Sequence, residues 1–190
     1  SVDNIKIKEI SKLNLSKYRK EYNKFIVEGF HLVEEAFKAN LLEEVLVLEN
    51  YNIDLDIPII FVTKKKKKKI TNLDTYPEVI GICKIVESNI VGNRILLLDG
   101  IQDPGNLGTI IRSAVAFNID TIVMSYESVD LYNPKVVRAT QGMLFHINIL
   151  KSDLYKNILE LKNNNYKIYT TNVNNGVDIN SLSDVTTNIN

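Results

Sequence analysis

The sequence is short of the residues that build cross-links and metal sites. Its 190 residues include one cysteine, two histidines and no tryptophan. A single cysteine, Cys83, excludes a disulfide framework and any zinc site made of several cysteines. The two histidines, His31 and His146, lie far apart in the sequence and do not by themselves predict a metal site. We therefore expect neither disulfides nor a bound metal.

Long apolar runs and an excess of one charge are also absent. No run approaches the ~20 apolar residues that span a bilayer, and the N-terminus has no signal-peptide core. Lys+Arg and Asp+Glu both number 23, which excludes a protein that is basic over its whole surface but not a local basic patch. The hydrophobic share of 45% is enough for a packed core. These features predict a soluble, cytoplasmic α/β protein without membrane association.

The first half of the chain, residues 1–90, combines short apolar runs with one amphipathic segment. The runs are typical of strands, and the segment has apolar residues at helical spacing. A polar stretch from 87 to 93 follows and predicts a domain boundary near residue 90. The lysine run 64–69 is interpreted either as a phosphate-binding patch or as a solvated segment. We predict strands at 24–27, 45–48, 59–62 and 79–82, and a helix at 29–39.

The second half, residues 91–190, alternates between strands and helices. This order predicts right-handed crossovers and a parallel sheet, with a ligand site at the carboxyl ends of the strands. Asn106 is expected to cap the first helix, and the pair Asn133-Pro134 to begin the second. We predict strands at 95–98, 121–124, 145–150 and 166–171, and helices at 107–117, from 134 to Gly142, and at 153–162.

One segment, residues 98–112, has the composition of a ligand-binding turn. It follows a buried strand, contains three glycines and a proline, and leads into a helix, so backbone N–H groups can approach an anion. It is neither a dinucleotide fingerprint nor a Walker motif. Arg112 is predicted in the second helical turn, and Arg138 lies in the corresponding segment after the next strand. Each arginine alone is typical of an ordinary surface residue, but two at one sheet edge favour phosphate binding.

These segments resemble a known family. Residues 106–112 match the N-x-G-x-x-x-R motif of the SpoU (TrmH-like) branch of the SPOUT RNA methyltransferases, and residues 133–139 resemble the P-K-V-x-R-A segment that follows it. The first half, with its sequences at 25–29 and 33–36, is similar to the substrate-binding domain often fused ahead of that enzyme. The resemblance covers nearly the whole chain.

The resemblance implies a fold and an activity. It implies an RNA substrate-binding domain at 1–90 and a SPOUT methyltransferase domain of the α/β-knot type at 91–190. The implied reaction transfers a methyl group from S-adenosylmethionine to a ribose 2′-hydroxyl of RNA, with ribosomal RNA favoured over transfer RNA, in a homodimer. Arg112 would be the catalytic arginine, Asn106 would organise the active-site loop, and Arg138 and Lys135 would bind the RNA backbone. Because a free guanidinium is a poor base, we expect Arg112 to orient and stabilise the acceptor oxygen.

Two further family motifs, a G-N-E-G loop and an S-L-N-V helix, are not found in these 190 residues. We therefore expect a chain that is C-terminally incomplete and binds the donor weakly, with Thr171 beside the donor and the remaining donor contacts beyond Asn190. The alternative is a non-catalytic RNA-binding or ribosome-assembly protein. A nucleotide-binding oxidoreductase is disfavoured because the dinucleotide fingerprint is missing.

A mixture of basic and aromatic residues lies near the N-terminus. Arg19 and Lys20 are flanked by Tyr18 and Tyr22, a combination that suits RNA phosphates and bases. The same pattern is typical of an amphipathic helix packed on the core. Cys83 is predicted to be a small buried residue and not a nucleophile.

Overall fold

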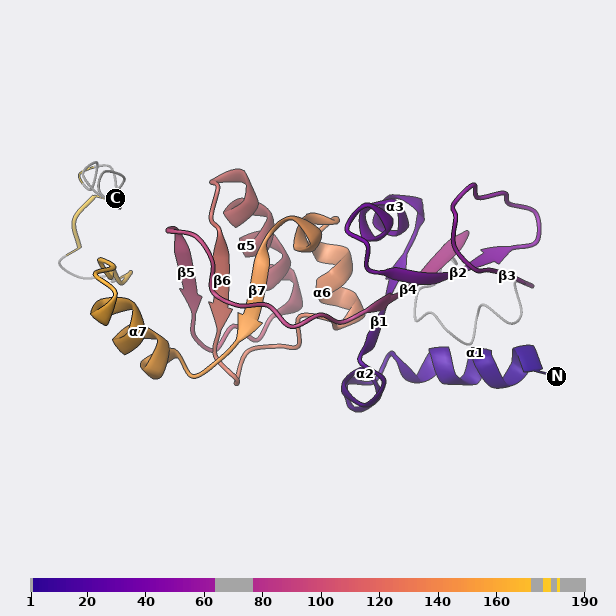
Figure 1. Cartoon of the computed structure of the whole chain (residues 1–190), viewed down its shortest axis with the longest axis horizontal. Coiled ribbons are helices and arrows are strands. Elements are labelled where there is room, and N and C mark those ends of the chain that lie inside the picture. Colours follow the sequence, from indigo (N-terminus) through magenta and orange to yellow (C-terminus); the bar gives the residue numbers. More distant parts are fainter. Residues whose placement is uncertain (1, 64–76, 172–175, 179–180, 182–190) are drawn as a thin grey trace.

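The computed structural model consists of two α/β units side by side along the long axis of the molecule (Figure 1). It describes residues 2–63, 77–171, 176–178 and 181, so the lysine run 64–69 lies outside the described residues. The first unit contains α1 (Val2–Lys12), α2 (Ser16–Tyr22), β1 (Lys24–Glu28), α3 (Phe30–Lys38), β2 (Leu42–Leu48), β3 (Ile59–Val62) and β4 (Val79–Lys84). The second contains β5 (Ile95–Leu98), α5 (Pro104–Ala116), β6 (Thr121–Met124), α6 (Pro134–Ala139), a 3₁₀ turn (Met143–His146), β7 (Asn148–Lys151) and α7 (Leu154–Asn163).

The first unit is a sheet with a helix on each face. Its strand order is β1-β4-β2-β3, and only the β2–β3 pair is parallel. Because side chains alternate along a strand, Phe25 and Val27 pack on the face covered by α3, whereas Ile26 packs on the face covered by α1. Figure 1 shows α3 and α1 on opposite sides of the sheet. The four predicted strands and the predicted helix are confirmed, whereas α1 had not been predicted.

The second unit is the predicted parallel sheet. Its strands lie in the order β5-β6-β7, and both neighbouring pairs are parallel. Helices α5 and α6 pack on one face, where Leu107, Ile111 and Val136 contact apolar residues of the strands. The fold class predicted from the sequence is therefore confirmed for this unit. No helix among the described residues is long and apolar enough to cross a membrane.

The start of α5 differs from the prediction. Asp103, not Asn106, caps the helix, and its carboxylate accepts a hydrogen bond from the backbone N–H of Asn106 at 2.7 Å. Pro104 occupies the first helical position, where the missing N–H costs nothing. The helix thus begins three residues earlier than predicted. Arg112 consequently lies in the third turn of α5 and not in the second.

Of the strands predicted in the second unit, the one at 145–150 is shorter in the structure, and the one at 166–171 is absent. Residues 143–146 form the 3₁₀ turn, so β7 is shorter than predicted and His146 precedes the strand instead of starting it. The segment 166–171 contains no strand. It runs past the start of β5, where the Tyr166 hydroxyl donates to the carbonyl oxygen of Gly92 at 2.9 Å. This hydrogen bond comes from a side chain, whereas pairing of two strands requires a series of backbone hydrogen bonds.

The two units pack against each other through an apolar contact. Phe25 of β1 packs against the ring of Tyr132, with centroids 4.6 Å apart, and against that of Phe145. Val137 and Leu144 of the second unit belong to the same buried cluster as the core of the first. Burial in this contact raises the pKa of Tyr132 to about 12, and the nearby Asp130 carboxylate adds to the shift. The relative orientation of the two units is therefore set by packing and not by a flexible linker.

Candidate active site

The glycine of the N-x-G-x-x-x-R segment sets the distance between α5 and α6. A Cβ added to Gly108 would lie 2.3 Å from the Cβ of Ala139 and 2.7 Å from its carbonyl carbon. No other residue fits this contact without moving one helix. The close approach of the two helices places Arg112 of α5 and Arg138 of α6 on the wall of the same cavity.

We expect Gly108→Ala to destabilise the protein, because the added methyl group would push against backbone atoms of α6. Overpacking of this kind costs about 1–3 kcal/mol, which should lower the melting temperature by several degrees in a calorimetric scan. Gly105→Ala in the same helix is the matched control. Its Cβ would meet only Asp103 Oδ2, at 3.1 Å, which is the end of a side chain and not a backbone atom. An equal melting temperature for both variants would contradict this account of Gly108.

The loop between β5 and α5 is held by the loop that follows β6. The N–H groups of Gly100 and Ile101 donate to the hydroxyls of Ser125 and Ser128, at 2.9 and 3.2 Å. The Val129 N–H donates to the Ile101 carbonyl oxygen at 2.8 Å. The Lys151 ammonium group donates to the Ser128 carbonyl oxygen, and partial burial lowers the pKa of Lys151. The turn that leads into α5 is therefore fixed at the carboxyl edge of the sheet.

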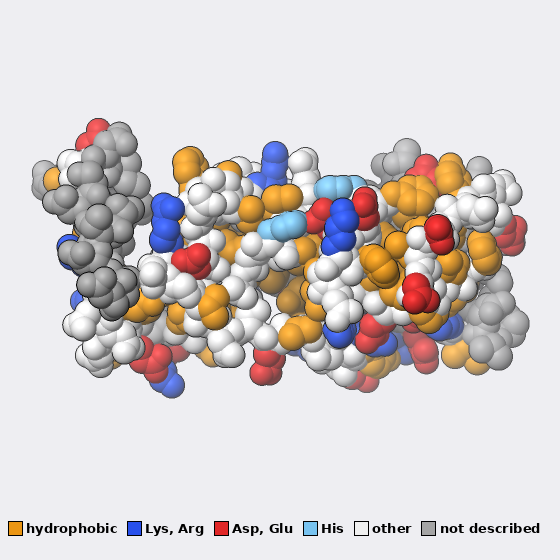
Figure 2. Space-filling model, turned by 45° about the horizontal axis from the view of Figure 1, so that its top comes forward, with side chains coloured by type: hydrophobic (Ala, Val, Ile, Leu, Met, Phe, Trp, Pro, Cys, Tyr) orange, Lys and Arg blue, Asp and Glu red, His pale blue; other side chains and the backbone are white. Residues whose placement is uncertain are grey.

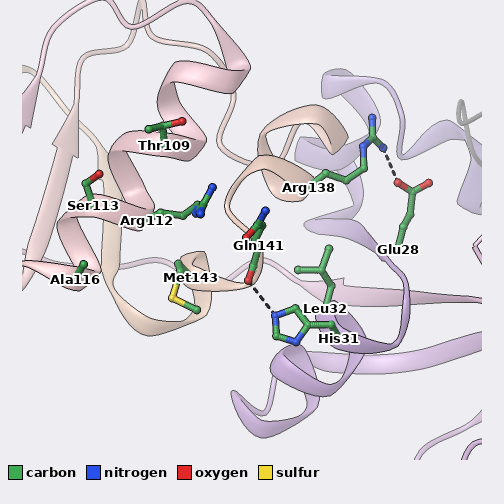
Figure 3. A pocket seen from close by; sticks show the side chains of 10 residues that line it. All are labelled: Glu28, His31, Leu32, Thr109, Arg112, Ser113, Ala116, Arg138, Gln141 and Met143. Atoms are coloured by element: carbon green, nitrogen blue, oxygen red, sulfur yellow. Dashed lines mark hydrogen bonds and ion pairs between the residues drawn. The ribbon is translucent and has the colours of Figure 1, made fainter.

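A cavity of about 860 Å³ lies between the two units. On the face drawn in Figure 2, the histidine side chains lie beside acidic and basic side chains near the middle of the molecule. The second unit contributes Arg112, Arg138 and Gln141 to the cavity, and the first contributes Glu28 and His31 (Figure 3). Two hydrogen bonds cross it: Arg138 Nη1 donates to Glu28 Oε2 at 2.5 Å, and His31 Nε2 lies 3.0 Å from the Gln141 carbonyl oxygen. The two units thus form one site, which the separate sequence patterns of the halves did not predict.

Arg112 is the cation of this cavity that has no partner within the described part of the chain. Its side chain is exposed, and no hydrogen bond or ion pair joins it to any described residue. In Figure 3 its guanidinium points into the cavity, toward Gln141. A guanidinium presents several N–H donors in one plane, a geometry that suits phosphate and other oxygen anions. Arg112 is therefore free to bind a negatively charged group of a ligand.

Arg138 and Lys135 have different surroundings on α6. The Arg138 guanidinium is held by the carboxylate of Glu28, whose side chain is only 4% exposed. Lys135 is exposed at the start of the helix, where the Asn133 side chain accepts its backbone N–H at 2.9 Å and caps the helix as predicted. Both cations lie on one helix, although only Arg138 lines the cavity.

Arg19 is buried and is not an RNA contact, contrary to the prediction. Its side chain is 3% exposed, and Nε and Nη2 both donate to Asp130 Oδ2, at 3.0 and 2.6 Å. Nη1 donates to the Leu13 carbonyl oxygen at 2.8 Å. Arg19 therefore joins the first unit to the loop that supports the turn before α5. Lys20 is exposed and stays available to a partner.

The residues predicted for the loop and for the donor are exposed. The Asn106 side chain lies in the first turn of α5 and caps nothing, while Thr171 lies in the irregular segment after α7. S-adenosylmethionine needs polar partners for its carboxylate and its adenine, but the N–H groups of Gly100 and Ile101 at the sheet edge already have partners. Those two N–H groups are therefore not available to a bound S-adenosylmethionine.

The sequence predicted neither a metal site nor a reactive cysteine. Among the described residues, no group of three or more His, Cys, Asp or Glu side chains is placed to hold a metal ion. Cys83 is buried, as predicted, and burial raises the pKa of its thiol. A thiol in this environment stays protonated and unreactive.

Comparison with known families assigns both units. Residues 93–188 match the SpoU rRNA Methylase family, and residues 4–81 match the MRM3-like substrate binding domain. The 23S rRNA (guanosine(2553)-2′-O)-methyltransferase RlmP of Bacillus subtilis is 35% identical over 182 residues, which cover 93% of this chain and 73% of that protein. The mitochondrial rRNA methyltransferase 3B of Danio rerio is 28% identical over 143 residues, or 66% of this chain and 32% of that protein.

Solved structures show the same arrangement of units. A TrmH-family RNA methyltransferase from Porphyromonas gingivalis, described as putative, superimposes with a TM-score of 0.76 at 26% identity, over 84% of this chain and 66% of that one. An AdoMet-bound rRNA methyltransferase from Sinorhizobium meliloti does so with a TM-score of 0.73 at 29% identity, over 85% of this chain and 67% of that one.

A parallel-sheet SPOUT methyltransferase unit joined to a substrate-binding unit is the class of protein that this fold and site define. The chain belongs to the SpoU rRNA Methylase family. It is an RNA 2′-O-ribose methyltransferase, and its methyl donor is S-adenosylmethionine.

Proposed function

We propose that the protein methylates a ribose 2′-hydroxyl of ribosomal RNA, and that residues 1–90 hold the RNA while residues 91–190 carry the chemistry. The observation that supports this most strongly is that Arg112, which has no partner among the described residues, lies in a cavity lined by both units. An RNA strand held by the first unit would lie beside that cavity, because Glu28 and His31 of the first unit line it. The Bacillus subtilis and Danio rerio relatives are both named as rRNA methyltransferases.

We assign to Arg112 the role of holding the RNA ribose that receives the methyl group. Its guanidinium binds the phosphate next to the target ribose and orients the 2′-oxygen for an in-line approach to the methyl carbon. It also stabilises negative charge on that oxygen as the O–H bond breaks. A guanidinium has no acceptor site for a proton, so Arg112 does not take up the proton, which passes to solvent in the open cavity. Alignment and charge stabilisation are the two contributions assigned to it.

The other predicted residues are proposed to bind the RNA near the target ribose, to organise the loop before α5 and to contact the methyl donor. Arg138 keeps Nε and Nη2 without a partner among the described residues, so it can bind a phosphate while Glu28 holds Nη1. Lys135 would add a second phosphate contact on the same helix. Asn106 would organise the loop before α5, and Thr171 would lie beside the donor.

The proposal includes a homodimer that works in the cytoplasm. Resemblance to the SpoU branch supports the dimer, and the bacterial rRNA methyltransferase relative supports the compartment. Sedimentation equilibrium should give about twice the chain mass of 21.6 kDa. A monomer at micromolar concentration would remove the dimer from the proposal.

An assay with two classes of RNA tests the substrate. Purified ribosomal RNA and transfer RNA from cells that lack the enzyme are incubated with it and with S-adenosylmethionine labelled in the methyl group. We expect label in the ribosomal RNA and none above background in the transfer RNA. The reverse distribution would contradict the proposed substrate while leaving the family assignment intact.

A further inference from the structure

Gln141 is a residue of the cavity that neither sequence motif explains. It follows α6 with a φ of 49°, in the left-handed region that side-chain-bearing residues seldom adopt. Such conformations persist where the surrounding structure fixes them, and they are enriched at functional sites. The backbone conformation of Gln141 therefore makes this residue a candidate for a functional role.

The backbone of Gln141 is fixed while its side chain is not. Its carbonyl oxygen accepts the hydrogen bond from His31 Nε2, and its N–H donates to the Arg138 carbonyl oxygen at 3.1 Å. The side chain is exposed, and its amide group bonds to no described residue. In Figure 3 it lies between the guanidinium groups of Arg112 and Arg138. The amide thus presents one donor group and one acceptor group in the cavity, and neither has a partner in the described part of the chain.

The remaining walls suit a flat ring. Leu32 and Met143 contribute apolar surface to the cavity, and Leu32 is otherwise buried. The volume of about 860 Å³ lies in the range of ~300–1,000 Å³ that is usual for pockets that bind small organic groups. Sequence-specific RNA recognition generally uses unstacked bases, whose edges accept and donate hydrogen bonds at once. A carboxamide matches such an edge because it can do both.

We propose that this cavity receives the unstacked base of the methylated nucleotide, and that the Gln141 amide hydrogen-bonds to the edge of that base. The inference rests on the proposed function, since it assumes that the ribose of the same nucleotide lies at Arg112. It adds a specificity-determining residue to the reaction. In this arrangement His31 of the first unit sets the position of the Gln141 backbone and thereby of its amide.

Substitution Gln141→Met tests the assignment, because it keeps the length of the side chain and removes both hydrogen-bonding groups. Ribosomal RNA is methylated with labelled donor and digested to nucleosides, and the labelled 2′-O-methyl nucleosides are separated. The unaltered enzyme should label one kind of nucleoside. The variant should lose about 10- to 100-fold in kcat/KM, the effect expected for one base-edge contact, and should label more than one kind.

Asn40→Met is the matched control. Asn40 is also an exposed amide residue at a positive φ, 58°, but it lies at the end of α3 and does not line the cavity. Its replacement should change neither the rate nor the identity of the product. Gln141→Gly is a second test variant, since glycine accepts this backbone conformation without strain. It should fold at least as well as the unaltered protein and lose base selectivity in the same way.

Three outcomes would overturn the inference. Retention of both the rate and the single product by Gln141→Met or Gln141→Gly would show that the amide does not contact the base. A loss of S-adenosylmethionine affinity in equilibrium dialysis, with selectivity kept, would assign the cavity to the donor. If the unaltered enzyme labelled no RNA, the proposed function would fail, and the base pocket with it.

Discussion

Arg112→Ala should reduce methyl transfer to RNA by at least about 10²–10³-fold, the loss seen when one stabilising donor is removed from a transition state. The melting temperature should stay within about a degree, because Arg112 is exposed and its side chain has no partner among the described residues. The transfer of labelled methyl groups in a single turnover measures the rate, and a thermal scan measures the melting temperature. The expected result is thus an inactive protein that is as stable as the original.

Arg94→Ala is the control for Arg112. Arg94 is an exposed arginine just before β5, at the amino edge of the same sheet. Its loss changes the net charge by the same amount without touching the cavity, so activity should be kept. Arg112→Lys should not restore activity, because a lysine keeps the charge but not the planar set of donors. Turnover near the original rate in Arg112→Ala would remove this residue from the mechanism.

Arg19→Met should destabilise the protein strongly. The change leaves the Asp130 carboxylate, 28% exposed, without its partner at the junction of the two units. Breaking a buried ion pair from one side costs about 3–5 kcal/mol, and the partial exposure of Asp130 reduces this to roughly 2–4 kcal/mol. Urea denaturation measures the loss in the free energy of unfolding.

Lys38→Met is the control for Arg19, because the Lys38–Glu34 pair lies in solvent with both side chains at least 60% exposed. It should leave the denaturation midpoint unchanged. The double variant Arg19→Met, Asp130→Leu should be more stable than Arg19→Met alone, since it leaves no charge unpaired. An unaltered midpoint in Arg19→Met would show that the ion pair does not hold the units together.

The strands could be predicted because they are continuous or alternating apolar runs bounded by polar residues. The start of α5 was predicted three residues too late, because Asp103 and Asn106 are both good capping residues. Pro104 favours the earlier start, because its fixed φ suits the first helical position. The strand predicted at 166–171 failed because an apolar pattern indicates a strand only where a neighbour is available to pair with it.

Part of the proposed site could be predicted from local sequence patterns. Their positions after successive strands predicted Arg112 and Arg138 near the carboxyl edge of the sheet. The structure places both on one cavity, but this cavity follows α5 as far as Ala116, the end of the helix that is remote from that edge. Arg19 was wrongly interpreted because basic and aromatic residues on a helix look alike whether they bind RNA or pack. Its partner, Asp130, lies 111 residues away in the sequence. The role of Gly108 depends on Ala139, and no local pattern indicates that contact.

The chemical position of the transferred methyl group tests the central claim most directly. Ribosomal RNA labelled by the enzyme is hydrolysed in alkali, which cleaves every linkage with an unmodified 2′-hydroxyl. We predict that the label is recovered in alkali-resistant dinucleotides, because a 2′-O-methyl group blocks cleavage at its own nucleotide. Recovery of the label in mononucleotides would place the methyl group on a base and contradict the account.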